Sequence, residues 1–172
     1  MTLSIHSVTV PALSQALRQL RHVLDKGAAH ARDRGIDPSV LLNMRLYPDM
    51  FPLLRQVQIA TDMAKNGAAR MAVIDPPAFP DDETGFDDLA ARIDKTIAFI
   101  ESIEPARFEG GENRSVTVKT RSKGELRFDG LDHLNNWLLP SVFFHVTTAY
   151  CILRHAGVVI GKFDYIGPVT TA

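Results

Sequence analysis

The sequence predicts an all-α protein, an up-and-down four-helix bundle with a short β-hairpin between its third and fourth helices. Three observations support this prediction. Apolar residues recur at spacings of three and four over four separate stretches, which is the period of amphipathic helices. Strict alternation of polar and apolar residues is confined to one short segment. No repeat or shift in composition divides the 172 residues, so we expect one domain spanning residues 1–172.

The first two helices are marked by apolar stripes and by residues that stop helices. The first should run from Val8 to Arg34 and stop at Gly35. Its stripe consists of Leu13, Leu17, Leu20 and Leu24. The second should follow Pro48, hold Pro52 in its first turn and end before Pro76. Its stripe consists of Met50, Leu53, Leu54, Val57, Ala60, Ala64, Ala68 and Met71.

A loop rich in proline and acidic residues precedes the third helix, and a hairpin follows it. Residues 75–85 should form the loop, and the helix should stop at Pro105. The stripe of this helix consists of Phe86, Leu89, Ile93, Ile97, Ile100 and Ile103. The alternating segments Ser115–Lys119 and Glu125–Asp129 flank a Ser-Lys-Gly turn, so they should pair as the hairpin.

The last predicted helix, Gly130–His155, is unusual because residues 134–153 contain no Asp, Glu, Lys or Arg. Pro140 lies inside it and cannot donate a backbone hydrogen bond, so we expect a kink one turn before His145. A side chain that titrates near neutral pH is costly to place in an apolar seam. His145 is therefore either a satisfied core residue or part of a functional site. The seam consists of Leu131, Leu134, Leu138, Val142, His145, Ala149, Ile152 and Ala156.

Composition and charge argue against several classes of function. The formal net charge of −1 and the lack of a basic run give no basis for binding nucleic acid. The N-terminus does not resemble a signal peptide, and residues 134–153 are too polar to span a membrane, so we expect a cytoplasmic protein without membrane contact. The single cysteine, Cys151, cannot form an internal disulfide and is expected to be an inert buried thiol.

The candidate ligand-binding residues are Gln56, Ser141, His145 and Thr148. The last three follow one strip of the last helix at spacings of four and three, so their side chains can converge. Gln56 is a polar residue on a largely apolar strip of the second helix. Two interpretations stay open. Gln56 and His145 either bond to each other and fix the helix register, or line a pocket for a small-molecule ligand, with His145 the candidate catalytic residue.

A metal ion needs three or four good ligands, and His145 is the one strong ligand in this neighbourhood. His133 lies about three turns upstream and His155 almost three turns downstream, so neither can share an ion with His145. We therefore expect no metal ion and no other cofactor.

Two further segments carry polar groups, and one of them, residues 161–167, is a candidate for the rim of a pocket. Arg45, in the segment RLYPDMFP, is expected to pair with Asp49 or Asp164. Residues 161–167 should form an ordered loop that folds back on the bundle.

The other side of the last helix predicts a partner. It carries Trp137, Phe144 and Cys151, so the helix is apolar on more than one side. Exposed on a monomer, these aromatic residues would form an unusually apolar surface. We therefore expect a homodimer formed through the last helix.

Two segments carry a resemblance to a known family. LLNMRLYPDMFPLLRQVQIATDMAK and FFHVTTAYCILRHAGVVIGKFDYIG resemble the uncharacterised bacterial domain-of-unknown-function family nineteen-ninety-three, which is placed in the DinB/YfiT-like superfamily. The resemblance covers almost the whole chain and implies a four-helix bundle. It also implies a metal site on three histidines, one from the second helix and two from the last at H-x-x-x-H.

This resemblance assigns a role to each candidate residue. His145 precedes Arg154 by nine residues and Gly157 by twelve, the spacing of the last metal ligand. Ser141 then stands at the preceding ligand position and Gln56 near the ligand position of the second helix. The resemblance thus implies a degenerate metal site, unsuited to zinc or nickel. Taken with the dimer expected from the last helix, this favours a homodimeric small-molecule-binding or interaction protein. The alternative is a metal- or thiol-dependent transferase or hydrolase that uses the pocket around His145, so the sequence leaves open whether the protein is an enzyme.

Overall fold

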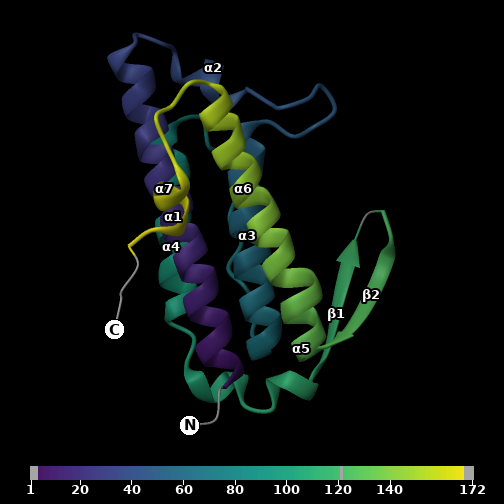
Figure 1. The fold of residues 1–172 in the computed structure, drawn as a ribbon. Coiled ribbons are helices and arrows are strands. Elements are labelled where there is room, and N and C mark those ends of the chain that lie inside the picture. Colours follow the sequence, from purple (N-terminus) through teal and green to yellow (C-terminus); the bar gives the residue numbers. More distant parts are fainter. Residues whose placement is uncertain (1–3, 121, 169–172) are drawn as a thin grey trace.

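The computed structural model describes residues 4–120 and 122–168. Its four long helices within these residues are α1 (Ile5–Asp33), α3 (Leu53–Ala72), α4 (Phe86–Glu101) and α6 (Leu139–His155). They lie side by side around a shared apolar core (Figure 1), which confirms a mainly helical fold with one hairpin. None of the helices in the described ranges is both long and apolar enough to cross a membrane.

The alternating up-and-down order of the helices is wrong, because α3 and α4 run in the same direction. Gln58, near the start of α3, bonds to Glu83 just before α4. Thr61, further along α3, bonds to Arg92, which is further along α4. Residues 73–85 make this possible, since an extended segment of that length reaches about 43 Å, against about 30 Å for a helix as long as α3. α6 runs against α3, because Gln56 meets His145 whereas Gly67 meets Leu138.

The first two long helices differ from the prediction at their N-terminal ends. α1 begins at Ile5 because Ser4 and Ser7 form a reciprocal capping box just before the predicted start. α3 begins at Leu53 and not after Pro48, since Pro52 is held in an extended conformation as the N-cap residue. A short helix that the sequence analysis missed, α2 (Pro38–Leu42), lies between them and is capped by the side chain of Asp37.

The predicted last helix is continuous but irregular. It consists of α5 (Gly130–Asp132), a π-helical segment (His133–Leu138) and α6. The irregularity near Pro140 takes the form of a π-type bond, in which Leu139 N–H donates to the carbonyl of Leu134, five residues back. This segment changes the helix phase. Leu131, predicted in the seam, is therefore 48% exposed, and His133 is fully buried.

The hairpin covers the start of the last helix. β1 (Ser115–Thr120) pairs antiparallel with β2 (Gly124–Asp129), and Val116 lies opposite Phe128. Two short 3₁₀ helices, Pro105–Phe108 and Gly111–Asn113, connect α4 to this hairpin. Phe128 packs against Trp137 with ring centroids 5.9 Å apart, so the hairpin shields part of the aromatic surface predicted to need a partner.

Residues 161–167 fold back on α1, as predicted, and they contain a short helix, α7 (Lys162–Ile166) (Figure 1). Asp164 in α7 accepts Lys26 Nζ at 2.6 Å and His22 Nε2 at 3.0 Å. The predicted Arg45–Asp164 pair is therefore wrong. Arg45 instead approaches the carbonyl of Pro48, and it has no carboxylate partner in the described part of the chain.

Candidate functional site

The structure brings together Gln56 of α3 and His145 of α6. Gln56 Nε2 donates to the carbonyl of Phe51 at 3.0 Å, which fixes the orientation of the amide. Its Oε1 therefore faces His145 and lies 2.8 Å from Nδ1. A carbonyl oxygen can only accept, so His145 must donate from Nδ1.

This hydrogen bond fixes the state of the imidazole. Burial lowers the pKa of His145 below its usual value, so the ring is neutral at neutral pH. With the proton on Nδ1, the lone pair is on Nε2. Nε2 has no hydrogen-bond partner among the described residues, and it is not enclosed by the protein. The site therefore presents one oriented acceptor to solvent.

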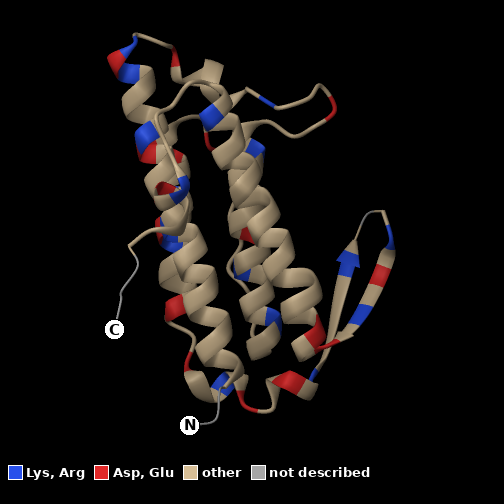
Figure 2. Cartoon of the chain, in the orientation of Figure 1, with Lys and Arg blue, Asp and Glu red and all other residues tan. Residues whose placement is uncertain are grey.

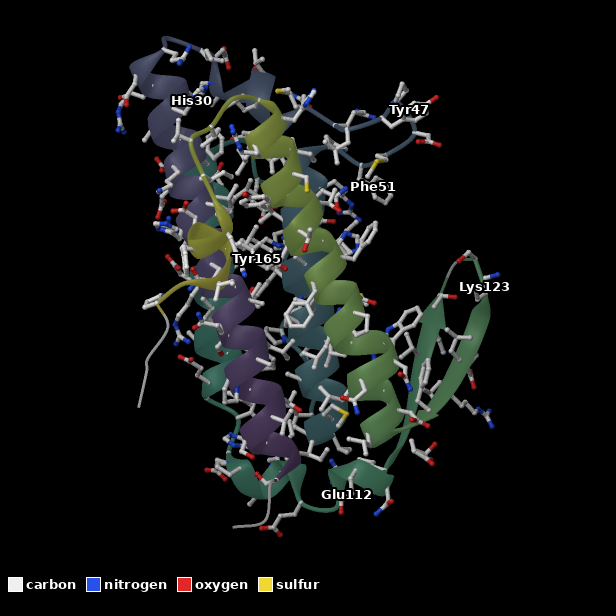
Figure 3. The ribbon with its side chains drawn as sticks, viewed as in Figure 1. His30, Tyr47, Phe51, Glu112, Lys123 and Tyr165 are labelled. Atoms are coloured by element: carbon white, nitrogen blue, oxygen red, sulfur yellow. The ribbon has the colours of Figure 1, made fainter. Side chains whose placement is uncertain are left out.

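Aromatic side chains flank this acceptor. The Phe144 ring meets the His145 ring edge-on with centroids 5.1 Å apart, and 58% of Phe144 is exposed. Phe51, whose carbonyl holds Gln56, is 55% exposed on the loop before α3. Figure 3 shows Phe51 and Tyr47 on this loop, with Tyr47 projecting outward. The His145 ring thus has one exposed aromatic ring against it, and the loop that holds Gln56 carries two more exposed aromatic side chains.

The other two predicted residues are not bonded to the Gln56–His145 pair. Thr148 is buried, and its hydroxyl donates to the carbonyl of Phe144 at 2.7 Å, so it is committed to its own helix. Ser141 is partly buried one turn before His145, and no described residue bonds to its hydroxyl. The predicted convergence therefore holds for Gln56 and His145 alone.

Gln56, Ser141 and His145, which the resemblance assigned to ligand positions, do not fit a tightly held metal ion. They supply one imidazole nitrogen, one amide and one hydroxyl, and the amide oxygen already accepts from His145. Across residues 4–120 and 122–168, no three His, Cys, Asp or Glu side chains lie close enough to share an ion.

Sequence reasoning missed a second polar cluster, centred on Arg92 of α4. This guanidinium is fully buried. Its Nε donates to Thr61 at 2.8 Å, Nη1 donates to Glu83 at 2.8 Å, and Nη2 donates to Asp62 at 2.9 Å. Further acceptors are the carbonyl of Pro80 and the carboxylate of Asp81. A signal existed, because Arg92 lies on the apolar face of its helix, between Leu89 and Thr96.

Sequence reasoning also missed the burial of His133, which the π-helical segment turns into the core. Burial, and then the charge of Arg70, lower its pKa to about 4, so it is neutral at neutral pH. Neither ring nitrogen has a hydrogen-bond partner among the described residues.

The comparisons with known proteins agree on one family. The model of a domain of unknown function, DUF1993, matches residues 5–166. A crystal structure of a DinB family member protein from Shewanella denitrificans is similar, with a TM-score of 0.89 and 36% sequence identity. The match covers 98% of this chain and 94% of that one. No curated protein matches the chain. The chain, with its Gln56–His145 pair between α3 and α6, therefore belongs to the DUF1993 family and has a DinB-like fold.

Proposed function

We propose that the protein binds a small molecule at His145, with Nε2 as the hydrogen-bond acceptor. The observation that carries this proposal is that Gln56 fixes the proton on Nδ1 and leaves the Nε2 lone pair unpaired and accessible.

The surroundings narrow the class of ligand. A neutral acceptor selects a hydroxyl or N–H donor, and the exposed rings of Phe144 and Phe51 favour an apolar or aromatic body beside it. Ser141, one turn before His145, offers a hydroxyl that is not committed to another described residue. Thr148 positions the helix and does not contact the ligand, because its hydroxyl is bonded to the backbone.

Phenol is a suitable probe because it combines one hydroxyl donor with an aromatic ring. We expect phenol to shift the Nε2 resonance of His145 in a saturable way in ¹⁵N-edited NMR spectra. H145F should abolish the response, and H155F, at the exposed end of the same helix, should retain it. A response that persists in H145F, or no saturable response, would count against the proposal.

We further propose that the superfamily metal site is degenerate in this chain. Metal analysis of protein purified without an affinity tag should give no stoichiometric zinc or nickel, whereas a Q56H/S141H double variant, which restores the histidine pattern, should bind one ion. Stoichiometric metal in the natural protein would instead favour the alternative, a metal-dependent transferase or hydrolase at His145.

A homodimer formed through α6 is the third part of the proposal. Phe143 and Phe144 of α6 are 40% and 58% exposed, and Figure 2 shows α6 almost without charged residues along its length. Trp137 no longer supports a dimer, since Phe128 of the hairpin packs against it. Light scattering should give the mass of a dimer, and F144D should give that of a monomer. A monomeric natural protein would contradict the dimer without affecting phenol binding.

A further inference from the structure

A second site candidate lies between the C-terminal end of α3 and the edge of β1, away from His145. A hollow of about 360 Å³ separates these elements. Its polar lining comes from Arg70, Asp75, Ser115 and Thr117, and Val116 contributes an apolar wall. The proposed function at His145 does not involve any of these residues.

Arg70 is the dominant charge in this hollow. Its guanidinium is partly buried, and the burial lowers its pKa. Yet within the described ranges it donates no side-chain hydrogen bond and forms no ion pair, although it has five N–H donors. Arg92, by contrast, has a partner for every side-chain nitrogen. An unpaired, partly desolvated arginine is poised to accept an anionic group.

Two further polar groups without partners lie behind the same wall. His133 and Trp137 are one helical turn apart, and the buried nitrogens of both rings lack hydrogen-bond partners among the described residues. Both rings contact Phe128, which lies opposite Val116 in the hairpin. Other unpartnered buried polar atoms in the described chain belong to Thr9, Ser14 and Arg21 of α1, but His133 is close enough to Arg70 for the guanidinium charge to lower its pKa.

The other charges around the hollow restrict which anion fits. Asp75 lines the same hollow, has no ion-pair partner among the described residues, and repels a dianion such as phosphate. The C-terminal end of α3 also repels a dianion, because its free carbonyl groups carry partial negative charge. We propose that this hollow binds a small α-amino carboxylate. Its carboxylate lies on Arg70 and its ammonium group on Asp75, with the Ser115 and Thr117 hydroxyls beside it.

Glycine, acetate and inorganic phosphate are the probes that test this proposal. Glycine should shift the backbone amide resonances of Val116 and Thr117 in a saturable way, and acetate should bind more weakly. R70Q should weaken glycine binding by about tenfold or more, the usual effect of losing a charged hydrogen bond. D75N should remove the preference for glycine over acetate. R18Q is the matched control, since Arg18 is an exposed arginine of α1 that pairs with Glu101 and does not line the hollow.

A second readout separates binding from a structural role of Arg70. A bound carboxylate offsets the charge of Arg70, so the pKa of His133 should rise from about 4 when glycine is present. No saturable binding of glycine, or equal binding by R70Q, would overturn the site. Tighter binding of phosphate than of glycine, or equal binding of glycine and acetate, would overturn the ligand class.

Discussion

The two sides of α3 treat polar side chains in opposite ways. Towards α4, every side-chain nitrogen of the buried Arg92 has a protein partner. Towards α6 and the hairpin, His145 keeps one nitrogen unpaired, and His133 and Arg70 have no side-chain partner among the described residues. Satisfied polar groups fix a structure, and the unsatisfied ones on the side towards α6 and the hairpin are where we propose that outside groups bind.

We call the side of α3 that faces α4 the closed side, and the side that faces α6 and the hairpin the open side. The closed side has a structural role. Residues 73–85 must run back along the bundle, and few of them are apolar enough to hold the segment in place. Glu83 and Asp81 tie this segment to Arg92, and Phe79 lies under the ammonium groups of Lys65 and Lys95 at 4.3 and 4.4 Å. The cluster therefore secures the parallel arrangement of α3 and α4.

The largest loss of stability is expected from removing the charge of Arg92 on the closed side. R92M removes the cation and leaves the nearly buried carboxylate of Glu83 unpaired, which costs about 3–5 kcal/mol of the free energy of unfolding. Urea denaturation followed by circular dichroism measures this loss. R127Q, which removes an exposed ion pair, should change the free energy of unfolding by less than about 1 kcal/mol. Similar small losses for both variants would mean that the cluster does not hold the fold.

The second effect concerns pH and the buried, unpaired His133. Its pKa is about 4 in the folded protein, against an ordinary value of 6.5, so between these values the unfolded chain binds more protons. The free energy of unfolding should therefore be unaffected above about pH 6.5 and fall by about 3 kcal/mol as the pH drops towards 4. H133F should remove most of this slope, leaving a smaller contribution of the same sign from His145, whose pKa is also lowered.

Urea denaturation at a series of pH values checks this prediction, with H155F as the control because His155 is exposed. The carboxylates of Glu83 and Asp81, whose pKa values are lowered, add their own loss of stability at lower pH. A slope above pH 5 that is as steep in H133F as in the natural protein would show that His133 is not the group responsible.

The helical framework could be predicted because it depends on local periodicity. Leu13, Leu17, Leu20 and Leu24 are all buried, as their spacing indicated. The direction of α4 could not be predicted, because it depends on whether residues 73–85 turn back at once or cross the bundle, and both fit a loop of that length. Contacts between Arg92 and the distant Asp62 decide it, and helix periodicity carries no information about such pairs.

The candidate site, like the fold, could be predicted only where local periodicity carries the information. The Gln56–His145 pair could be anticipated, because each residue is a polar interruption of an apolar stripe. The burial of His133 could not, since the π-helical segment shifts the helix phase by less than one turn and leaves no periodic signal. Thr148 was predicted to face the ligand, but its hydroxyl bonds locally to Phe144, an alternative open to any helical threonine.

A smaller effect is expected from changing the partner of His145 on the open side. Q56L leaves His145 Nδ1–H and the carbonyl of Phe51 without their partner, at a cost of about 1–2 kcal/mol. Q56E keeps the acceptor and adds a negative charge, so it should raise the pKa of His145 above that of the natural protein. An NMR titration of the His145 ring measures the pKa. An unchanged pKa in Q56E would contradict the hydrogen bond on which the proposed acceptor depends.

The smallest effect comes from the end of α3, beside the hollow that Arg70 lines. Val73 adopts a left-handed conformation with φ of 53°, which is unfavourable for a β-branched residue, and its side chain is 66% exposed. V73G should therefore raise the free energy of unfolding by about 1 kcal/mol, because glycine is the preferred residue at this position after a helix. Urea denaturation measures the gain, and glycine titration of the same variant tests its meaning. If V73G is more stable but binds glycine less well, the strained conformation of Val73 contributes to the shape of the hollow that binds glycine. If stability rises and binding is unchanged, the shape of the hollow does not depend on this residue.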